Sequence, residues 1–228
     1  MKVSIIIPVF NEERHIRKVI DQVLEVPLKI SKEIIIVDDG SHDRTPEILR
    51  KFQAKKAIKV IFQKENLGKG AAIRKGLKVA MGEIILIQDA DLEYSIDDYP
   101  ALLKPLVEGH ADIVYGSRFK GKITGMRWPN FLANKILTLS ANLLYGLNIS
   151  DEATAYKAFK REVIKSIPLK CQRFEFCPEV TAKAAKKHYR FLEVPITYHG
   201  RDAQKGKKIK AKDGFEALWT LIKYRFKD

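Results

Sequence analysis

The sequence predicts an α/β fold in which a mostly parallel sheet is covered by helices on both faces. Short uninterrupted apolar runs, such as residues 34–37 and 84–87, alternate along the chain with longer amphipathic segments. Strands without polar alternation are buried on both faces, and regular alternation of strand and helix produces parallel pairing. With 228 residues, the chain is long enough to form one domain with a sizeable core.

The expected elements follow in a regular order through the first half of the chain. Buried strands are expected at residues 3–9, 33–39, 58–63, 83–89 and 111–117. Helices are expected at residues 11–26, after Pro46, at 68–80 and around 97–108. Because ligands of such sheets bind beyond the carboxyl ends of the strands, the residues that follow each strand are the first candidates for a site.

The pattern changes after about residue 118, although we expect residues 1–228 to form a single domain. Residues 129–147 predict a largely apolar helix with a polar stripe at Asn134, Thr138 and Asn142. The remaining expected elements are strands at 154–159 and 190–198, a helix near 178–187, a basic loop at 201–212 and an amphipathic helix at 213–226.

The net charge of +14 requires an explanation. Nucleic acid, an anionic membrane surface and phosphorylated ligands are the candidate partners, and a solvated lysine-rich surface is the alternative. The loop at 201–212 carries six basic residues against Asp202, a net of +5, next to a helix that contains Trp219. This combination indicates contact with an anionic membrane surface, unless the helix packs on the core with its lysines in water.

Other features suggest a cytoplasmic protein. The apolar runs are too short to cross a bilayer, and the chain enters its first strand without a signal peptide. The two cysteines, Cys171 and Cys177, match no zinc-binding spacing and are expected to be reduced thiols.

Polar side chains gather where the expected strands end. They are Asn11, Glu12, Asp38, Asp39, Asp89 and Asp91. Two carboxylates in the segment Asp89-Ala90-Asp91 repel each other unless a positive charge lies near them. Carboxylate oxygens suit Mg²⁺ or Mn²⁺, and a diphosphate supplies further ligands. We therefore expect a divalent metal and a nucleoside diphosphate here.

Two common nucleotide-binding signatures are absent from the sequence. No G-x-G-x-x-G follows the first strand, and "NLGKGAA" (66–72) lacks the leading glycine and the Ser/Thr of a P-loop. Hydride transfer and P-loop chemistry are therefore disfavoured.

Five motifs, in this order, resemble those of inverting family 2 glycosyltransferases: "VSIIIPVFNEE", "IIIVDDGSHDRT", "NLGKGAAIRKGLKVAMGE", "QDADLE" and "YGSRF". The chain is most similar to the polyprenyl-phosphate (dolichol-phosphate) mannose synthase branch. The resemblance implies the GT-A (Rossmann-like) fold, with a nucleotide-sugar-binding half at 1–118 and an acceptor half at 119–228. Further similar segments in the second half are "DEATAYKAF", "FEFCPEVTAK", "EVPITYHGR" and "GKKIKAKDG".

The resemblance also implies roles for individual residues. The nucleotide-sugar-binding set would be Pro8, Phe10, Glu12, Val37, Asp39, Asp89, Ala90, Arg201 and Lys207. Within it, Asp39 would accept hydrogen bonds from the base or ribose, and Arg201 and Lys207 would belong to a loop that closes over phosphate. Asp91 would be the direct metal ligand, Glu93 a third ligand, and Arg118 a phosphate contact. Asp91 and Arg118 are thus the expected catalytic residues.

Several assignments stay open at this point. Asp38 either belongs to the site or braces its turn, and Arg74 either reaches the site or covers a helix face. Glu179 is either a base or acceptor-side group, or a buried carboxylate paired with a lysine. Asn66 and residues 68–70 are expected to form a turn and the beginning of a helix, and not to contact a ligand. Tyr156 and Phe174 are expected in the core.

The implied reaction is inverting transfer of one hexose from a GDP-mannose or UDP-glucose type donor to a polyprenyl or dolichyl phosphate. Single transfer is expected because the Q-x-x-R-W motif of processive synthases is absent. The segment Thr154-Ala155-Tyr156 and the missing serine after Gly206-Lys207 depart from the family pattern on the acceptor side, so a soluble hydroxyl acceptor stays an alternative. A membrane-protein partner is also considered.

Two rival functions fit the sequence less well. A sugar nucleotidyltransferase would need a glycine-rich basic loop after the first strand, where "PVFNEE" is acidic instead. A nucleic-acid-binding module would account for the charge but would place carboxylates next to phosphates, so nucleic acid is not expected as a partner.

Overall fold

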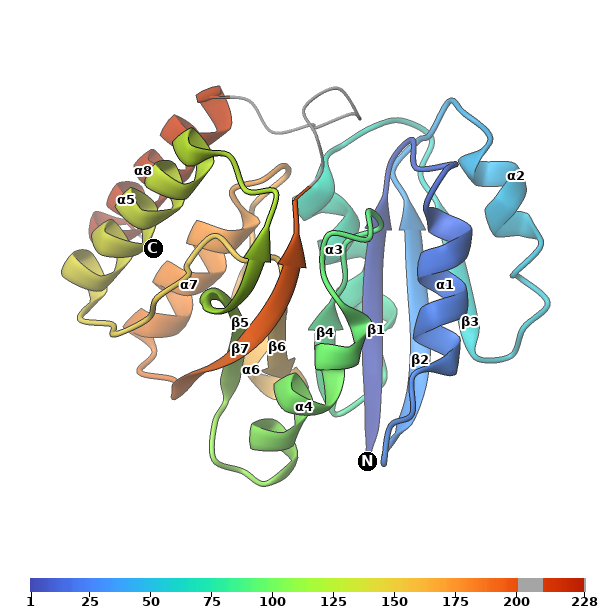
Figure 1. The fold of residues 1–228 in the computed structure, drawn as a ribbon, viewed down its shortest axis with the longest axis horizontal. Coiled ribbons are helices and arrows are strands. Elements are labelled where there is room, and N and C mark those ends of the chain that lie inside the picture. The colour runs from blue at the N-terminus through green and yellow to red at the C-terminus, as the bar shows by residue number, and fades with distance from the viewer. Residues whose placement is uncertain (201–210, 228) are drawn as a thin grey trace.

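A computed structural model describes residues 1–200 and 211–227 of the chain, and Figure 1 shows its arrangement. Seven strands form one sheet in the order β3-β2-β1-β4-β6-β5-β7. The strands are β1 (Lys2–Val9), β2 (Ser31–Asp38), β3 (Ile58–Phe62), β4 (Ile84–Ile87), β5 (Ile113–Thr124), β6 (Lys157–Lys160) and β7 (Phe191–His199). The helices are α1 (Ile16–Glu25), α2 (Thr45–Arg50), α3 (Lys69–Val79), the 3₁₀ helix η1 (Ile96–Asp98), α4 (Tyr99–Val107), α5 (Trp128–Tyr145), α6 (Arg161–Lys165), α7 (Phe176–Lys186) and α8 (Ala211–Phe226).

The sheet is mostly parallel, which confirms the predicted fold class. Strands β1, β2, β3 and β4 pair in parallel, as do β5 and β7. Strand β6 departs from this pattern, because it runs antiparallel to both β4 and β5. The polar ends of β1, β2 and β4 therefore meet at one edge of the sheet.

Helices cover both faces of the sheet, as the continuous apolar strands predicted (Figure 1). Alternate strand residues point to opposite faces. Ile5 and Ile7 pack with α1 in one buried cluster, whereas Ile6 packs with α3 and α7 in the other. A third, smaller cluster joins α5, α7 and α8 through residues such as Ala182 and Leu221.

The first helix begins later than the sequence predicted. Helix α1 starts at Ile16, whereas the prediction placed its start at Asn11. The intervening residues bind the loop after β2 instead: the Asn11 amide donates to Ser41 Oγ at 2.9 Å, and the Glu12 amide donates to Thr45 Oγ1 at 2.9 Å. Asn11 also adopts a positive φ of 49°, which is incompatible with a helical turn.

Helix α5 turns its polar stripe toward the protein. Thr138 Oγ1 accepts from the Glu152 amide at 2.9 Å, and the Asn142 side chain both donates to and accepts from the Ile149 backbone. Large apolar side chains of α5 consequently face outward; they are Trp128, Leu132, Ile136, Leu139 and Leu143. The adjacent α8 also exposes Phe215, Trp219, Ile222 and Phe226. We call these nine side chains the apolar α5–α8 surface.

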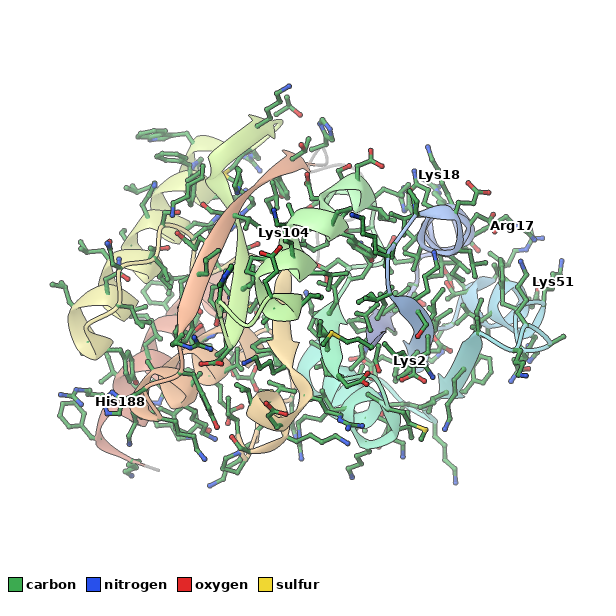
Figure 2. The ribbon with its side chains drawn as sticks, turned by 90° about the horizontal axis from the view of Figure 1, so that it is seen from below. Lys2, Arg17, Lys18, Lys51, Lys104 and His188 are labelled. Atoms are coloured by element: carbon green, nitrogen blue, oxygen red, sulfur yellow. The ribbon has the colours of Figure 1, made fainter. Side chains whose placement is uncertain are left out.

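Among the described residues, no helix combines the length and the apolar character needed to cross a membrane. Many basic side chains project from exposed positions over the rest of the molecule, including Arg17, Lys18, Lys51 and Lys104 (Figure 2). Part of the positive charge is therefore spread over the solvated surface.

Candidate functional site

The loops after β1 and β2 form one wall of the candidate site. Pro8 and Val37 are partners in the parallel β1–β2 register, and both are buried. Beyond the strand end, the Phe10 ring makes an edge contact with the His42 ring, with centroids 6.4 Å apart. Glu12 is buried beside His15, whose Nδ1 lies 2.9 Å from Glu12 Oε2. The structure thus places Pro8, Phe10, Glu12 and Val37 at the neighbouring carboxyl ends of β1 and β2.

Asp39 ties this wall to the loop that precedes α3. Its Oδ1 accepts from Gln63 Nε2 at 2.5 Å and from the Leu67 amide at 2.9 Å, and its Oδ2 accepts from the Gly68 amide at 2.8 Å. Burial raises the pKa of Asp39 above its usual value, although these hydrogen bonds oppose the shift. A ligand that used this carboxylate would share it with the loop.

Asp38 braces its own turn, which resolves one open assignment. Its Oδ1 accepts from the Ser41 hydroxyl at 2.5 Å and from the Ser41 amide at 3.3 Å. Burial raises the pKa of this carboxyl group as well.

Lys69, at the first position of α3, supplies a positive charge beside the Asp89-Ala90-Asp91 segment. Its Nζ lies 2.5 Å from Asp89 Oδ1, and both side chains are mostly buried, at 19% and 18% exposure. Burial alone would lower the pKa of Lys69, but Asp89, together with Cys177 and Asp91, raises it above its usual value. The sequence analysis did not predict this role for Lys69, because it assigned residues 68–70 to the beginning of a helix.

Asp91 and Glu93 follow on a backbone that Leu92 turns with a positive φ of 62°. Asp91 Oδ1 accepts from the Glu93 amide at 3.2 Å, and Glu93 Oε2 accepts from the Tyr198 hydroxyl at 2.7 Å. Within residues 1–200 and 211–227, no three His, Cys, Asp or Glu side chains gather as a metal site. One or two carboxylates suffice for Mg²⁺ when phosphate and water complete its shell, so this donor set fits a metal that arrives with a diphosphate.

Arg118 forms a buried, bidentate ion pair with Asp151. Its Nε donates to Asp151 Oδ2 at 2.7 Å, and its Nη2 donates to Oδ1 at 2.8 Å. The guanidinium also lies over the Tyr198 ring, 5.2 Å from its centroid. Sequence reasoning assigned Arg118 to phosphate but missed Asp151, whose position depends on the fold of the second half.

The second half contains further buried polar groups. Lys157 Nζ lies 3.3 Å from the centroid of the Tyr115 ring and donates to the Glu152 carbonyl. Burial lowers the pKa of Lys157 and raises that of Glu152. Cys171 and Cys177 are free cysteines, and burial raises the pKa of both thiols.

The remaining open assignments are settled by contacts. Glu179 pairs with Lys183 at 2.5 Å and accepts from the Lys170 and Cys171 amides, so it is the buried, lysine-paired carboxylate. Arg74 donates to carbonyls of residues 170 and 171, and thus binds the segment between α6 and α7.

The two aromatic residues read as core differ from each other. Tyr156 is fully buried, as expected, whereas Phe174 is only half-buried. Arg201 and Lys207, with most of the predicted basic loop, lie outside the described residues.

The sequence profile of glycosyl transferase family 2 matches residues 4–167. Dolichol-phosphate mannosyltransferase of Pyrococcus furiosus is 30% identical over 98% of this chain and 64% of its own length. Dolichyl-phosphate beta-glucosyltransferase ALG5A of Trichomonas vaginalis is 33% identical over 96% of this chain and 72% of its own. Dodecaprenyl-phosphate galacturonate synthase of Rhizobium johnstonii is 26% identical over 89% and 60%. The chain thus spans less than two thirds of several relatives.

Solved structures show the same fold. Glucosyl-3-phosphoglycerate synthase from Mycobacterium tuberculosis, in complex with Mn²⁺, uridine diphosphate and phosphoglyceric acid, has a TM-score of 0.75 at 18% identity. This likeness covers 100% of the present chain and 79% of that one. The same enzyme with Mg²⁺ and uridine diphosphate gives a TM-score of 0.73 at 18% identity, over 98% and 79%.

Proposed function

The chain belongs to glycosyl transferase family 2, and on this premise we propose that it transfers one hexose from a nucleoside-diphosphate sugar to a polyprenyl or dolichyl phosphate, with inversion at the anomeric carbon. One observation carries the proposal. Relatives that match nearly the whole chain at 30% and 33% identity are named for transfer to dolichol or dolichyl phosphate.

The donor would bind where β1, β2 and β4 end. Pro8, Phe10 and Glu12 would contact the nucleotide from one side, and Val37 and Asp39 from the other. The Asp89-Ala90 peptide would lie along the ribose and diphosphate. Support comes from the shared location of these residues at the carboxyl edge of the parallel strands, where α/β sheets bind ligands.

Asp91, with Glu93, would hold Mg²⁺ or Mn²⁺. The bound metal would stabilise the negative charge that develops on the departing diphosphate. The solved enzyme with the same fold was crystallised with these two metals and uridine diphosphate, which supports the choice of ion.

The reaction is a single in-line displacement. An acceptor phosphate oxygen forms a bond to the anomeric carbon as the bond to the donor diphosphate breaks, and the nucleoside diphosphate leaves as an anion. The acceptor is already anionic at neutral pH, so a strong general base is unnecessary. Positioning and positive charge from Arg118, Arg201 and Lys207 carry most of the catalysis. Because Nε and Nη2 of Arg118 donate hydrogen bonds to Asp151, a hydrogen bond to phosphate would come from Nη1.

The apolar α5–α8 surface would contact an anionic membrane at its cytoplasmic face, where a lipid acceptor resides. Exposed tryptophans and phenylalanines suit the interface of a bilayer. Helix α8 also carries Lys212, Lys223 and Arg225, and Lys227 follows it directly. Each basic residue near an anionic surface contributes about 1 kcal/mol to binding.

Vesicle co-sedimentation tests this contact. The protein should sediment with vesicles that contain phosphatidylserine, and far less with phosphatidylcholine alone. The double variant Leu139→Asp/Trp219→Asp should lose binding, whereas Met81→Asp, an exposed apolar residue elsewhere, should not. Equal binding by both variants would remove this surface from the proposal. Binding that requires a co-expressed membrane protein would replace the lipid surface with a protein partner.

A transfer assay tests the function itself. Labelled GDP-mannose and UDP-glucose are incubated with Mg²⁺ or Mn²⁺ and a short polyprenyl phosphate. We expect label from one donor to move into the organic phase and Asp91→Ala to reduce the rate at least a hundredfold, as loss of a main charge stabiliser does. Metal-dependent donor hydrolysis without lipid product would point to a soluble hydroxyl acceptor. Release of diphosphate from a nucleoside triphosphate would identify a nucleotidyltransferase instead.

A further inference from the structure

The Lys69–Asp89 pair differs from the ordinary ion pairs of this protein. Lys104 and Glu108, for example, are 72% and 42% exposed and lie 4.0 Å apart, which is typical of a weak surface contact. Lys69 and Asp89 are both less than one-fifth exposed and 2.5 Å apart. A lysine placed this close, in so little water, neutralises one of the two carboxylates of the Asp89-Ala90-Asp91 segment.

The position of Lys69 is fixed on both sides along the backbone. The Gly68 amide donates to Asp39 Oδ2 at 2.8 Å, and the Gly70 amide donates to the Arg173 carbonyl at 2.9 Å. Gly68 has a φ of +97°, and a Cβ there would lie 2.5 Å from the Gln172 carbonyl oxygen. The start of α3 is therefore clamped, and its first side chain is directed at Asp89.

We infer that Lys69 makes metal binding depend on the donor, because it occupies Asp89 in the donor-free protein and leaves the metal with Asp91 and Glu93. Two physical effects support this. Lys69 removes one carboxylate from the possible ligands, and its positive charge repels an approaching divalent cation. A nucleoside diphosphate reverses both effects, since its oxygens supply ligands and its charge offsets that of Lys69. This inference rests on the proposed metal site.

The consequence is that metal and nucleotide bind with positive coupling. The donor-free protein binds Mn²⁺ weakly, and each ligand raises the affinity for the other by the same factor. Without Lys69, Asp89 becomes available to the metal even when no diphosphate is present.

Mn²⁺ titration, followed by the electron paramagnetic resonance of the free ion, tests this directly. Wild type and Lys69→Met are titrated with and without GDP or UDP. We expect Lys69→Met to bind Mn²⁺ at least tenfold more tightly than wild type without nucleotide, and the gain from added nucleotide to shrink. Lys75→Met, an exposed lysine on the same helix, is the matched control and should behave as wild type.

Substitution of Asp89 provides a second, independent test of the role of Lys69. Asp89→Asn alone should not strengthen nucleotide-free Mn²⁺ binding, because Lys69 keeps its positive charge and loses its counter-charge. In Lys69→Met/Asp89→Asn, the tenfold gain should disappear. Circular dichroism checks that each variant is folded.

The outcomes separate this inference from the proposed function. If Lys69→Met matches wild type without nucleotide, while Asp91→Ala abolishes Mn²⁺ binding, the role of Lys69 is wrong and the metal site stands. If Mn²⁺ fails to bind wild type with or without GDP or UDP, the metal site itself fails, and both proposals fall with it.

Discussion

Two ion pairs, one in β5 and one at the start of α3, each join a basic residue to an aspartate but differ in structure. Arg118 and Asp151 are 7% and 0% exposed, and two parallel hydrogen bonds join them. Lys69 and Asp89 share a single contact at the edge of the sheet and keep about a fifth of their surface in water. The first pair is a fixed tie between β5 and the segment before β6, whereas the second can be exchanged when another ion arrives.

The chemistry of the two cations matches this division. A guanidinium presents a rigid fork that fits a carboxylate in two places, while an ammonium is a compact point charge on a flexible stem. Breaking a fully buried pair leaves an uncompensated charge in the core, whereas water compensates part of the charge when both partners keep about a fifth of their surface exposed. The difference indicates that the Arg118–Asp151 pair fixes the position of its guanidinium, whereas the Lys69–Asp89 pair can open when a ligand binds.

The largest expected effect comes from Asp151→Asn. This change leaves the buried Arg118 guanidinium without its counter-charge, and we expect it to lower the free energy of unfolding by about 3–5 kcal/mol. Urea denaturation measures the change. Asp89→Asn, the matched substitution in the other pair, should cost less, because water reaches about a fifth of both side chains. Equal losses for the two variants would contradict the distinction drawn between the pairs.

An intermediate effect is expected from Gly68→Ala, which disturbs the clamp that presents Lys69. The left-handed φ and the contact with the Gln172 carbonyl should together cost about 2–3 kcal/mol. Gly109→Ala is the control, since Gly109 also has a positive φ (75°) but a Cβ there meets nothing within 4 Å. Thermal unfolding of both variants separates the effect of the clash from that of the backbone strain. If Gly68→Ala lost less stability than Gly109→Ala, the loop around residue 172 would have moved to relieve the clash.

The smallest effect concerns a third carboxylate, Asp112, which binds Arg190 and Lys160, side chains that are 56% and 25% exposed. The Arg190 hydrogen bonds hold the pKa of Asp112 well below its usual range. A carboxyl group whose pKa is lowered on folding stabilises the protein when the pH is above the pKa of the unfolded state, here 3.8. This contribution is lost as the pH falls toward the pKa of the folded state.

Asp112→Asn should therefore be less stable than wild type above about pH 5, and the difference should shrink steadily as the pH falls below 3.8 toward the much lower folded-state pKa. Denaturation midpoints across this range measure it, and 1 M salt should reduce it. A difference that stayed constant with pH would mean that Asp112 acts through packing and not through its charge.

Much of the site's frame was predictable because it depends on local pattern. Asp39 and Asp89 follow apolar runs, and parallel strands necessarily bring their ends together, as the structure confirms. Most helices and strands were likewise expected from periodicity within a few residues. The start of α1 was wrong, because its first residues bind a loop some thirty positions away, which no local signal records.

Other parts depend on contacts that only the fold establishes. Nothing in "NLGKGAA" tells which carboxylate Lys69 will meet, since Asp89 lies twenty residues further along the chain. Asp151 similarly reaches Arg118 across a loop and a helix. The antiparallel direction of β6 follows from the return path of the chain, and an apolar strand reads the same in either direction.

Helix α5 turns Thr138 and Asn142 inward and Leu132, Leu139 and Leu143 outward, and this arrangement affects how the molecule behaves in solution. The apolar α5–α8 surface favours self-association, and the net charge of +14 opposes it by repulsion between copies. At 0.1 M salt this repulsion reaches only about 10 Å. Colloidal stability is thus set by the ionic strength of the buffer, and detergent or lipid substitutes for charge when salt is high.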